Sequence, residues 1–174
     1  ITHALEYMRK PAPEGADSCF TMAGLMEQTL IALSTSMERR NMRLTTAEMD
    51  LHVTARGDPK LIHHAAWMML LGIVRFAADE STLRMRCLYN GNRTHAILSI
   101  TISELAPGRL SEAEREAHLE RQLKHLTPHM FAETIRQHAN LQLAELLLQP
   151  HHGTLSITPI SHYACEICLT LPAA

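Results

Sequence analysis

"NLQLAELLLQPHHGTLSITPISHYACEICLTLP", residues 140–172, is the stretch that decides the fold. It begins with a leucine-rich run, which predicts a helix that ends in a hydrophobic core. Two runs with the alternation of β-strands follow, at residues 154–160 and 165–172. Between the helix and the strands stand His151 and His152. The adjacent histidines are therefore either a metal or catalytic site, or the joint between a helix and a strand.

The composition restricts the kinds of protein and of partner. A chain of 174 residues that is 46% hydrophobic can bury the core of one globular domain. Its 16 basic and 18 acidic residues give a formal net charge of -2, so it lacks the basic surface of a nucleic-acid-binding protein or of a helix that lies on a membrane. We therefore expect no nucleic-acid partner and no direct membrane contact.

No stretch predicts export or a membrane span. The longest apolar run, AAWMMLLGIVRFAA, is interrupted by Arg75 and is shorter than the ~20 residues that a span needs, so we interpret it as a buried helix. The opening ITHALEYMRK lacks the features of a signal peptide. The four cysteines are too few and too scattered for a disulfide scaffold. A cytoplasmic location, as a separate protein or as the cytosolic part of a membrane-bound sensor, is the simplest expectation.

A domain boundary is predicted near the beginning of the chain. Residues 1–13 resemble the last turns of a helix followed by a proline-containing linker, which leaves residues 14–174 as the domain. Apolar residues at three- and four-residue steps then predict an amphipathic helix from Phe20 to Arg40. Asn41 is a suitable residue to end that helix.

Short strands surround a second, buried helix. Runs of apolar and β-branched residues predict strands at 42–46 and 51–55. Asp58 is suited to cap the helix that follows and Pro59 to occupy its first turn. Two alternating runs on either side of Asn90-Gly91 then predict a β-hairpin with a tight turn.

The order of elements predicts the fold class. A surface helix is predicted at 108–126 and a second helix at 128–149, before the closing strand pair. Strand pairs interspersed with helices favour an α+β protein, in which helices pack on one face of a mainly antiparallel or mixed sheet. We therefore expect a two-layer α/β sandwich.

Three segments of the chain resemble a known family. In order and spacing, GDPKLIHHAAWMMLLGIVRFA, ILSITISELAPGRLSEAE and the opening stretch are similar to the catalytic ATP-binding domain of two-component sensor histidine kinases, of the GHKL type. The resemblance runs from about Phe20 to Pro172. It implies the ATPase-domain fold, and it implies that the first residues are the tail of a dimerisation helix.

The family's nucleotide motifs are altered in this chain. Where the resemblance implies two asparagines that hold phosphate and Mg²⁺, Met68 and Gly72 stand, and neither offers an oxygen ligand. The family's aspartate and two glycines, which bind adenine and allow the backbone to approach the ligand, are matched by Glu104, Ala106 and Gly108. The longer side chain of Glu104 would enter the space of the adenine ring.

The phosphate-binding turn and the lid also differ. Asn140 and Gln142 stand where the resemblance implies glycines that present backbone amides to phosphate at a helix start. The lid is matched by residues 111–126, a strong helix-forming segment whose glutamates would repel phosphate. The positions that build the fold agree with the family, while the positions that bind its ligand do not.

The resemblance implies two alternative functions. The first is a degenerate histidine-kinase-like domain with weak or no ATP binding and no cofactor. It would act as a regulatory module or dock a response-regulator receiver domain in a phosphorelay, and would form homodimers through upstream helices. The second is an active ATP-dependent histidine kinase domain that uses ATP and Mg²⁺ in an altered site, with Glu104, Gly108 and Asn140 as residual contacts.

Three other motifs are interpreted as structural. Cys165 and Cys168 lie three apart in a predicted strand, so their thiols should point to opposite faces and bind no zinc. The pair His63-His64 lies in the central helix, where adjacent residues cannot bind one metal as an i, i+4 pair does; one is expected to face solvent and one the interior. In the light of the resemblance, His151-His152 is a joint, and Gly153 permits a backbone conformation that a side chain would oppose.

Overall fold

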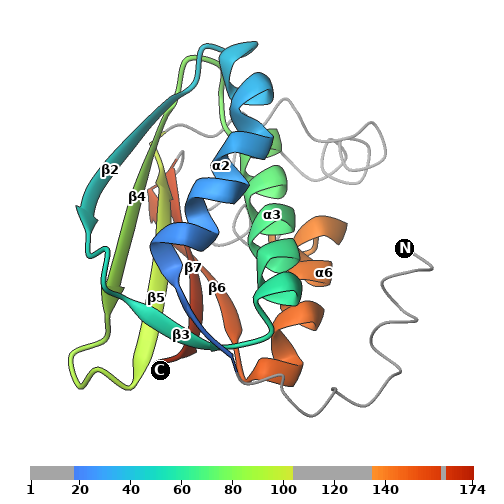
Figure 1. The fold of residues 1–174 in the computed structure, drawn as a ribbon. Coiled ribbons are helices and arrows are strands. Elements are labelled where there is room, and N and C mark those ends of the chain that lie inside the picture. The colour runs from blue at the N-terminus through green and yellow to red at the C-terminus, as the bar shows by residue number, and fades with distance from the viewer. Residues whose placement is uncertain (1–17, 104–134, 162–163) are drawn as a thin grey trace.

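The computed structural model describes residues 18–103, 135–161 and 164–174 (Figure 1). Its elements, in chain order, are β1 (Ser18–Thr21), α2 (Met22–Glu38), β2 (Arg43–Met49), β3 (Thr54–Gly57), α3 (Pro59–Phe76), β4 (Thr82–Tyr89), β5 (His95–Ile102), α6 (Ala139–Leu148), a short 3-10 helix (Gln149–His151), β6 (Thr154–Ser161) and β7 (Ala164–Pro172). The predicted surface helix at 108–126 and the predicted tail and linker at 1–13 lie outside the described residues.

The strands form one five-stranded mixed sheet and one small ribbon. The sheet has the order β2-β4-β5-β7-β6, in which β2 is parallel to β4 and the other neighbours are antiparallel. The ribbon pairs β1 with β3. Helices α2, α3 and α6 all lie on one side of the sheet (Figure 1). The predicted α+β sandwich is therefore confirmed.

Burial alternates along the central strands, as expected for a sheet covered on one face. In β7, Cys165, Ile167, Leu169 and Leu171 are buried, while every residue between them is partly exposed. β4 has the same pattern, with its buried residues at Leu83, Met85 and Cys87. The core therefore lies between one face of the sheet and the helices, and no helix of the described residues covers the opposite face.

The first predicted helix is confirmed with shorter limits. Helix α2 begins after Thr21, whose hydroxyl accepts a hydrogen bond from the Gly24 amide at 3.3 Å. Asn41 has a φ of 50°, the left-handed conformation that commonly follows a helix end, so its predicted role is confirmed. Phe20, predicted as helical, belongs instead to β1. This strand has four residues, too few for a pattern of alternation to be recognised.

Helix α3 is closed at both ends by side chains. The Asp58 carboxylate accepts hydrogen bonds from the amides of Lys60 and Leu61, at 2.8 and 3.4 Å, which confirms the predicted cap. At the other end, the Arg40 guanidinium donates to the carbonyls of Val74 and Ala77. It also forms an ion pair with Asp79 at 2.8 Å. The last residues of α2 and α3 are thereby tied together.

Two local predictions are wrong in detail. The β4–β5 hairpin is present, but its turn is not a tight two-residue turn: Asn90 and His95 close a longer loop, in which Arg93 has a φ of 56°. The helix predicted over 128–149 is interrupted, because residues 137 and 138 are not helical and α6 starts only at Ala139. The backbone of His138 is extended, with φ −66° and ψ 134°, and this ends any helix that approaches it.

Candidate functional site

Two of the predicted site segments meet where α3 and α6 pack together. Gly72 is buried on α3, and a Cβ placed on it would lie 3.3 Å from Leu141 Cγ and 3.7 Å from Asn140 Cβ. The position that matches a magnesium-binding asparagine thus directly faces the segment that matches the phosphate-binding turn. A side chain at position 72 would have to displace Leu141, because 3.3 Å is tighter than ordinary van der Waals contact.

The other predicted site residues are only partly brought together. Met68 lies one turn before Gly72, is partly buried and packs against the hydrophobic core. Gln142 is exposed on α6, so it does not fill the contact between the two helices. Glu104 and Gly108 lie outside the described residues. The described part of the site therefore consists of Gly72, Met68 and the first turn of α6.

The first turn of α6 has the position of an anion-binding helix start, but its amides already have partners. His138 Nδ1 accepts a hydrogen bond from the Asn140 amide at 3.3 Å. The carbonyl of His138 accepts from the Leu141 amide at 2.9 Å, in addition to the regular first helical bond from Gln142 at 3.1 Å. Asn140 and Leu141 carry two of the amides that a helix start normally leaves free for water or an anion. In this chain the preceding histidine takes them.

The His138 ring is held in place by the last residue of α3. The ring centroids of Phe76 and His138 are 5.1 Å apart with an interplanar angle of 87°, an edge-to-face contact. Phe76 is itself fully buried. His138 was not among the predicted site residues, because Ser, Thr, Asp and Asn are the usual helix caps and a histidine before Ala139 carries no comparable signal.

The described residues offer little to a cation. Neither Met68 nor Gly72 has a side-chain oxygen, and hard cations such as Mg²⁺ require oxygen ligands. In residues 18–103, 135–161 and 164–174, no group of three or more His, Cys, Asp or Glu side chains is placed to hold a metal ion.

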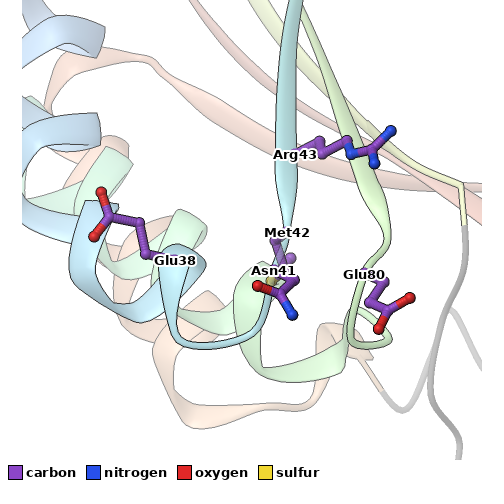
Figure 2. Close-up of a pocket in the computed structure, with 5 residues that line it drawn as sticks. All are labelled: Glu38, Asn41, Met42, Arg43 and Glu80. Atoms are coloured by element: carbon purple, nitrogen blue, oxygen red, sulfur yellow. The ribbon is translucent and has the colours of Figure 1, made fainter.

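A separate polar hollow opens where α2 leads into β2. Figure 2 shows its lining side chains, which are Glu38, Asn41, Met42, Arg43 and Glu80. The hollow is open and has a volume of about 610 Å³. None of its lining residues belongs to the contact between Gly72 and α6. Its two carboxylates and one guanidinium give it mixed charge, so it is not an evident site for a polyanion such as ATP.

The two adjacent histidines form a joint, and they have different roles in it. His151 is 8% exposed and packs against Gly57, where an added Cβ would lie 3.2 Å from His151 Cγ. His152 has the left-handed conformation, with a φ of 54°. The predicted reason for Gly153 is wrong, since the unusual conformation is that of His152. Space favours glycine at position 153, because an added Cβ would lie 2.9 Å from a methyl carbon of Leu171 and 3.1 Å from Leu148 Cβ.

The thiols of the C-x-x-C motif lie on opposite faces of β7, as predicted. Cys165 is buried and Cys168 is partly exposed on the other face of β7, and both are free thiols. Burial raises the pKa of Cys165 to about 12, so it stays a neutral thiol at physiological pH. His64 is exposed and His63 is partly buried, but Nε2 of His63 has no hydrogen-bond partner among the described residues.

Solved structures with the same fold are histidine kinases. The Acinetobacter baumannii histidine kinase AdeS matches with a TM-score of 0.65 and 12% identity, over 98% of this chain and 74% of that one. A mycobacterial sensor histidine kinase, MprB, matches with a TM-score of 0.62 and 16% identity, over 90% and 97%. Full-length ShkA in complex with AMPPNP matches with a TM-score of 0.66 and 12% identity, over 99% and 34%.

The chain thus has the fold of histidine kinase catalytic domains, as the sequence resemblance implied. No protein-family profile and no curated protein matches the sequence. None of the helices within the described ranges is both long and apolar enough to cross a membrane.

Proposed function

We propose that this chain is a degenerate histidine-kinase-like domain that binds little or no ATP and acts as a regulatory or docking module of a two-component signalling protein. Its fold, which it shares with histidine kinase catalytic domains, supports the placement in two-component signalling. A fold can be retained while the chemistry of its site changes, because core packing and ligand contacts depend on different residues.

One observation supports the proposed loss of nucleotide binding: groups of the chain itself contact the positions that match the family's nucleotide site. The amide of Asn140 donates to His138, and Leu141 packs directly against Gly72. A phosphate at this helix start would have to displace His138 from its cap, and an oxygen ligand at position 72 would have to displace Leu141. Both changes would cost free energy. A domain with glycines in this turn and a less closely packed α6 would bind phosphate without that cost.

The partner that follows from this proposal is a response-regulator receiver domain. The structures with the same fold include sensor kinases, and a module that has lost catalysis can still hold the partner of the phosphorelay. Homodimerisation through helices upstream of the chain and a cytoplasmic location belong to the same proposal.

The retained acid and glycine in ELAPG favour the competing hypothesis of an active kinase domain. Glu104 and Gly108 match the adenine-binding acid and one glycine of the family, and Asn140 could contribute a polar contact. In that case ATP and Mg²⁺ would be the cofactors of an altered site.

Nucleotide titration separates the two hypotheses. The chain is titrated with a fluorescent ATP analogue, with and without Mg²⁺, and ShkA, which was solved with AMPPNP, serves as the positive control. The proposal expects no saturable signal up to roughly millimolar nucleotide, a dissociation constant that corresponds to only about 4 kcal/mol of binding free energy. Saturation in the micromolar range would contradict the proposal and establish the altered kinase site.

A further inference from the structure

The face of the five-stranded sheet that the helices leave uncovered carries arginines on two neighbouring strands. Leu83, Met85 and Cys87 of β4 point into the core, so the residues between them, Arg84 and Arg86, point to the uncovered face. On β2 the same alternation places Arg43 and Thr45 on that face, since Met42 is buried and Leu44 packs against the core. Figure 2 shows the Arg43 side chain extending away from the helices.

One of these arginines, Arg86, already forms ion pairs with acidic side chains of the chain. Its guanidinium lies 2.5 Å from a carboxylate oxygen of Glu166 and 3.7 Å from one of Glu48. It also donates a hydrogen bond to the Ser99 hydroxyl at 3.3 Å. The hydrogen bond with Glu166 raises the pKa of Arg86, so this arginine remains charged. Its guanidinium is therefore already paired with Glu166.

Arg43 and Arg84 differ from Arg86 because no acid of the described chain pairs with them. Both are exposed, and neither makes a side-chain hydrogen bond or ion pair to another described residue. The register pairs Arg84 with Thr45, two residues beyond Arg43, so the two arginines are diagonal neighbours on one face. With strands about 4.8 Å apart and a rise of about 3.3 Å per residue, such neighbours lie roughly 8 Å apart at their Cα atoms, within reach of one extended acidic segment.

We propose that the uncovered face of β2 and β4, centred on Arg43, Thr45 and Arg84, is a docking surface for a carboxylate-rich segment of a protein partner. Each guanidinium can bind a carboxylate through two parallel hydrogen bonds, and the Thr45 side chain between the arginines is exposed. This inference does not depend on whether the domain has lost ATP binding, because the surface is on the opposite side of the sheet from α3 and α6 (Figure 1).

A protein segment fits the surface better than a nucleic acid. The chain has a net charge of -2, and the neighbours of Arg84 on the face are Thr45 and Thr101, with no aromatic side chain on which a base could stack. Two unpaired guanidinium groups match a few carboxylates, whereas polyanion binding requires many cations. We expect a weak, rapidly formed and salt-sensitive complex.

Fluorescence anisotropy with a charged peptide tests the surface. A short fluorescein-labelled polyglutamate peptide is titrated with the chain and with the double variant Arg43→Glu/Arg84→Glu. We expect the unaltered chain to bind the peptide and added NaCl to weaken the complex. The double variant should bind at least about tenfold more weakly, because two attractive contacts become repulsive. Circular dichroism melting confirms that the variant is folded.

The control is a double variant with the same change of net charge at two arginines outside the proposed surface. Arg75 and Arg93 are also exposed, on α3 and on the β4–β5 loop, and Arg75→Glu/Arg93→Glu should leave peptide affinity within about twofold. An equal loss in the control would overturn the proposal, because binding would then follow net charge alone. It would also be overturned if the unaltered chain did not bind the peptide, or if a single-stranded oligonucleotide of equal charge bound more tightly.

Discussion

Helices α3 and α6 pack against each other, yet their N-terminal ends are closed by different chemistry. At α3 a carboxylate, Asp58, accepts hydrogen bonds from two amides. At α6 an imidazole nitrogen of His138 accepts from one. The carboxylate also complements the positive end of the helix dipole, whereas the ring nitrogen supplies only a lone pair. A residue that is not acidic can thus provide partners for the amides of a helix start, as His138 does for Asn140 and Leu141.

The largest effect is expected just before α3, at Gly57. Its φ of 143° disfavours any side chain, and a Cβ would lie 2.5 Å from Ile62 Cδ1. Gly57→Ala should lower the free energy of unfolding by about 3 kcal/mol, from backbone strain and overpacking together. Urea denaturation measures this loss, and Gly91→Ala is the control, because an added Cβ there has no neighbour within 4 Å. Equal stability of the two variants would contradict the close packing of Gly57 against α3.

The next effect concerns the contact between the helices. Gly72→Asn restores the residue type of the family motif, but its Cβ would lie 3.3 Å from Leu141 Cγ. We expect a loss of about 1–3 kcal/mol of unfolding free energy from overpacking, and no gain of ATP-analogue binding. If the variant gained Mg²⁺-dependent nucleotide binding at unchanged stability, the α6 start would be open and the proposed self-occupied site would be wrong.

The cap of α3 should contribute less than the packing around it. Asp58→Ala removes the acceptor for the amides of Lys60 and Leu61 and should lower the free energy of unfolding by about 1 kcal/mol. Asp58→Asn retains an acceptor oxygen and should recover most of that stability. Thermal melting of the two variants side by side measures the difference, which would vanish if the cap did not stabilise α3.

The smallest effect is expected at the α6 cap. His138→Ala removes one acceptor and the ring contact with Phe76, and should lower the free energy of unfolding by roughly 0.5 kcal/mol. His138→Asn, which caps well but lacks the ring, separates the two contributions. If His138→Ala were as destabilising as Asp58→Ala or more so, the two helix starts would not differ in the way that their chemistry indicates.

The start of one of these helices could be predicted from the sequence, and the start of the other could not. Asp58-Pro59 combines a strong cap with a residue suited to the first turn, so the start of α3 was predictable. The start of α6 was not, because residues 128–149 have continuous helical character and the break at 137 and 138 depends on tertiary contacts such as that between Phe76 and His138. Propensity describes each segment alone, and packing between segments decides such breaks.

Some features of the candidate site can likewise be predicted from the sequence, and others cannot. The loss of oxygen ligands at Met68 and Gly72 follows from residue types, and the sequence alone reveals it. The contact of Gly72 with Leu141 and the capture of the Asn140 amide depend on how closely two helices approach, which no local pattern encodes. The sequence thus indicates which residue types stand at these positions, and only the structure indicates what they contact.

The guanidinium of Arg40 has a consequence for how this corner of the molecule opens. Helix ends usually fray, because their last carbonyls have no partner within the helix. Arg40 satisfies the carbonyls of Val74 and Ala77, so the end of α3 can fray only if the end of α2 detaches as well. Phe76 lies between these carbonyls and holds the ring of His138. We therefore expect the turn after α2, the end of α3 and the start of α6 to open together, and to exchange their amide hydrogens more slowly than a free helix end.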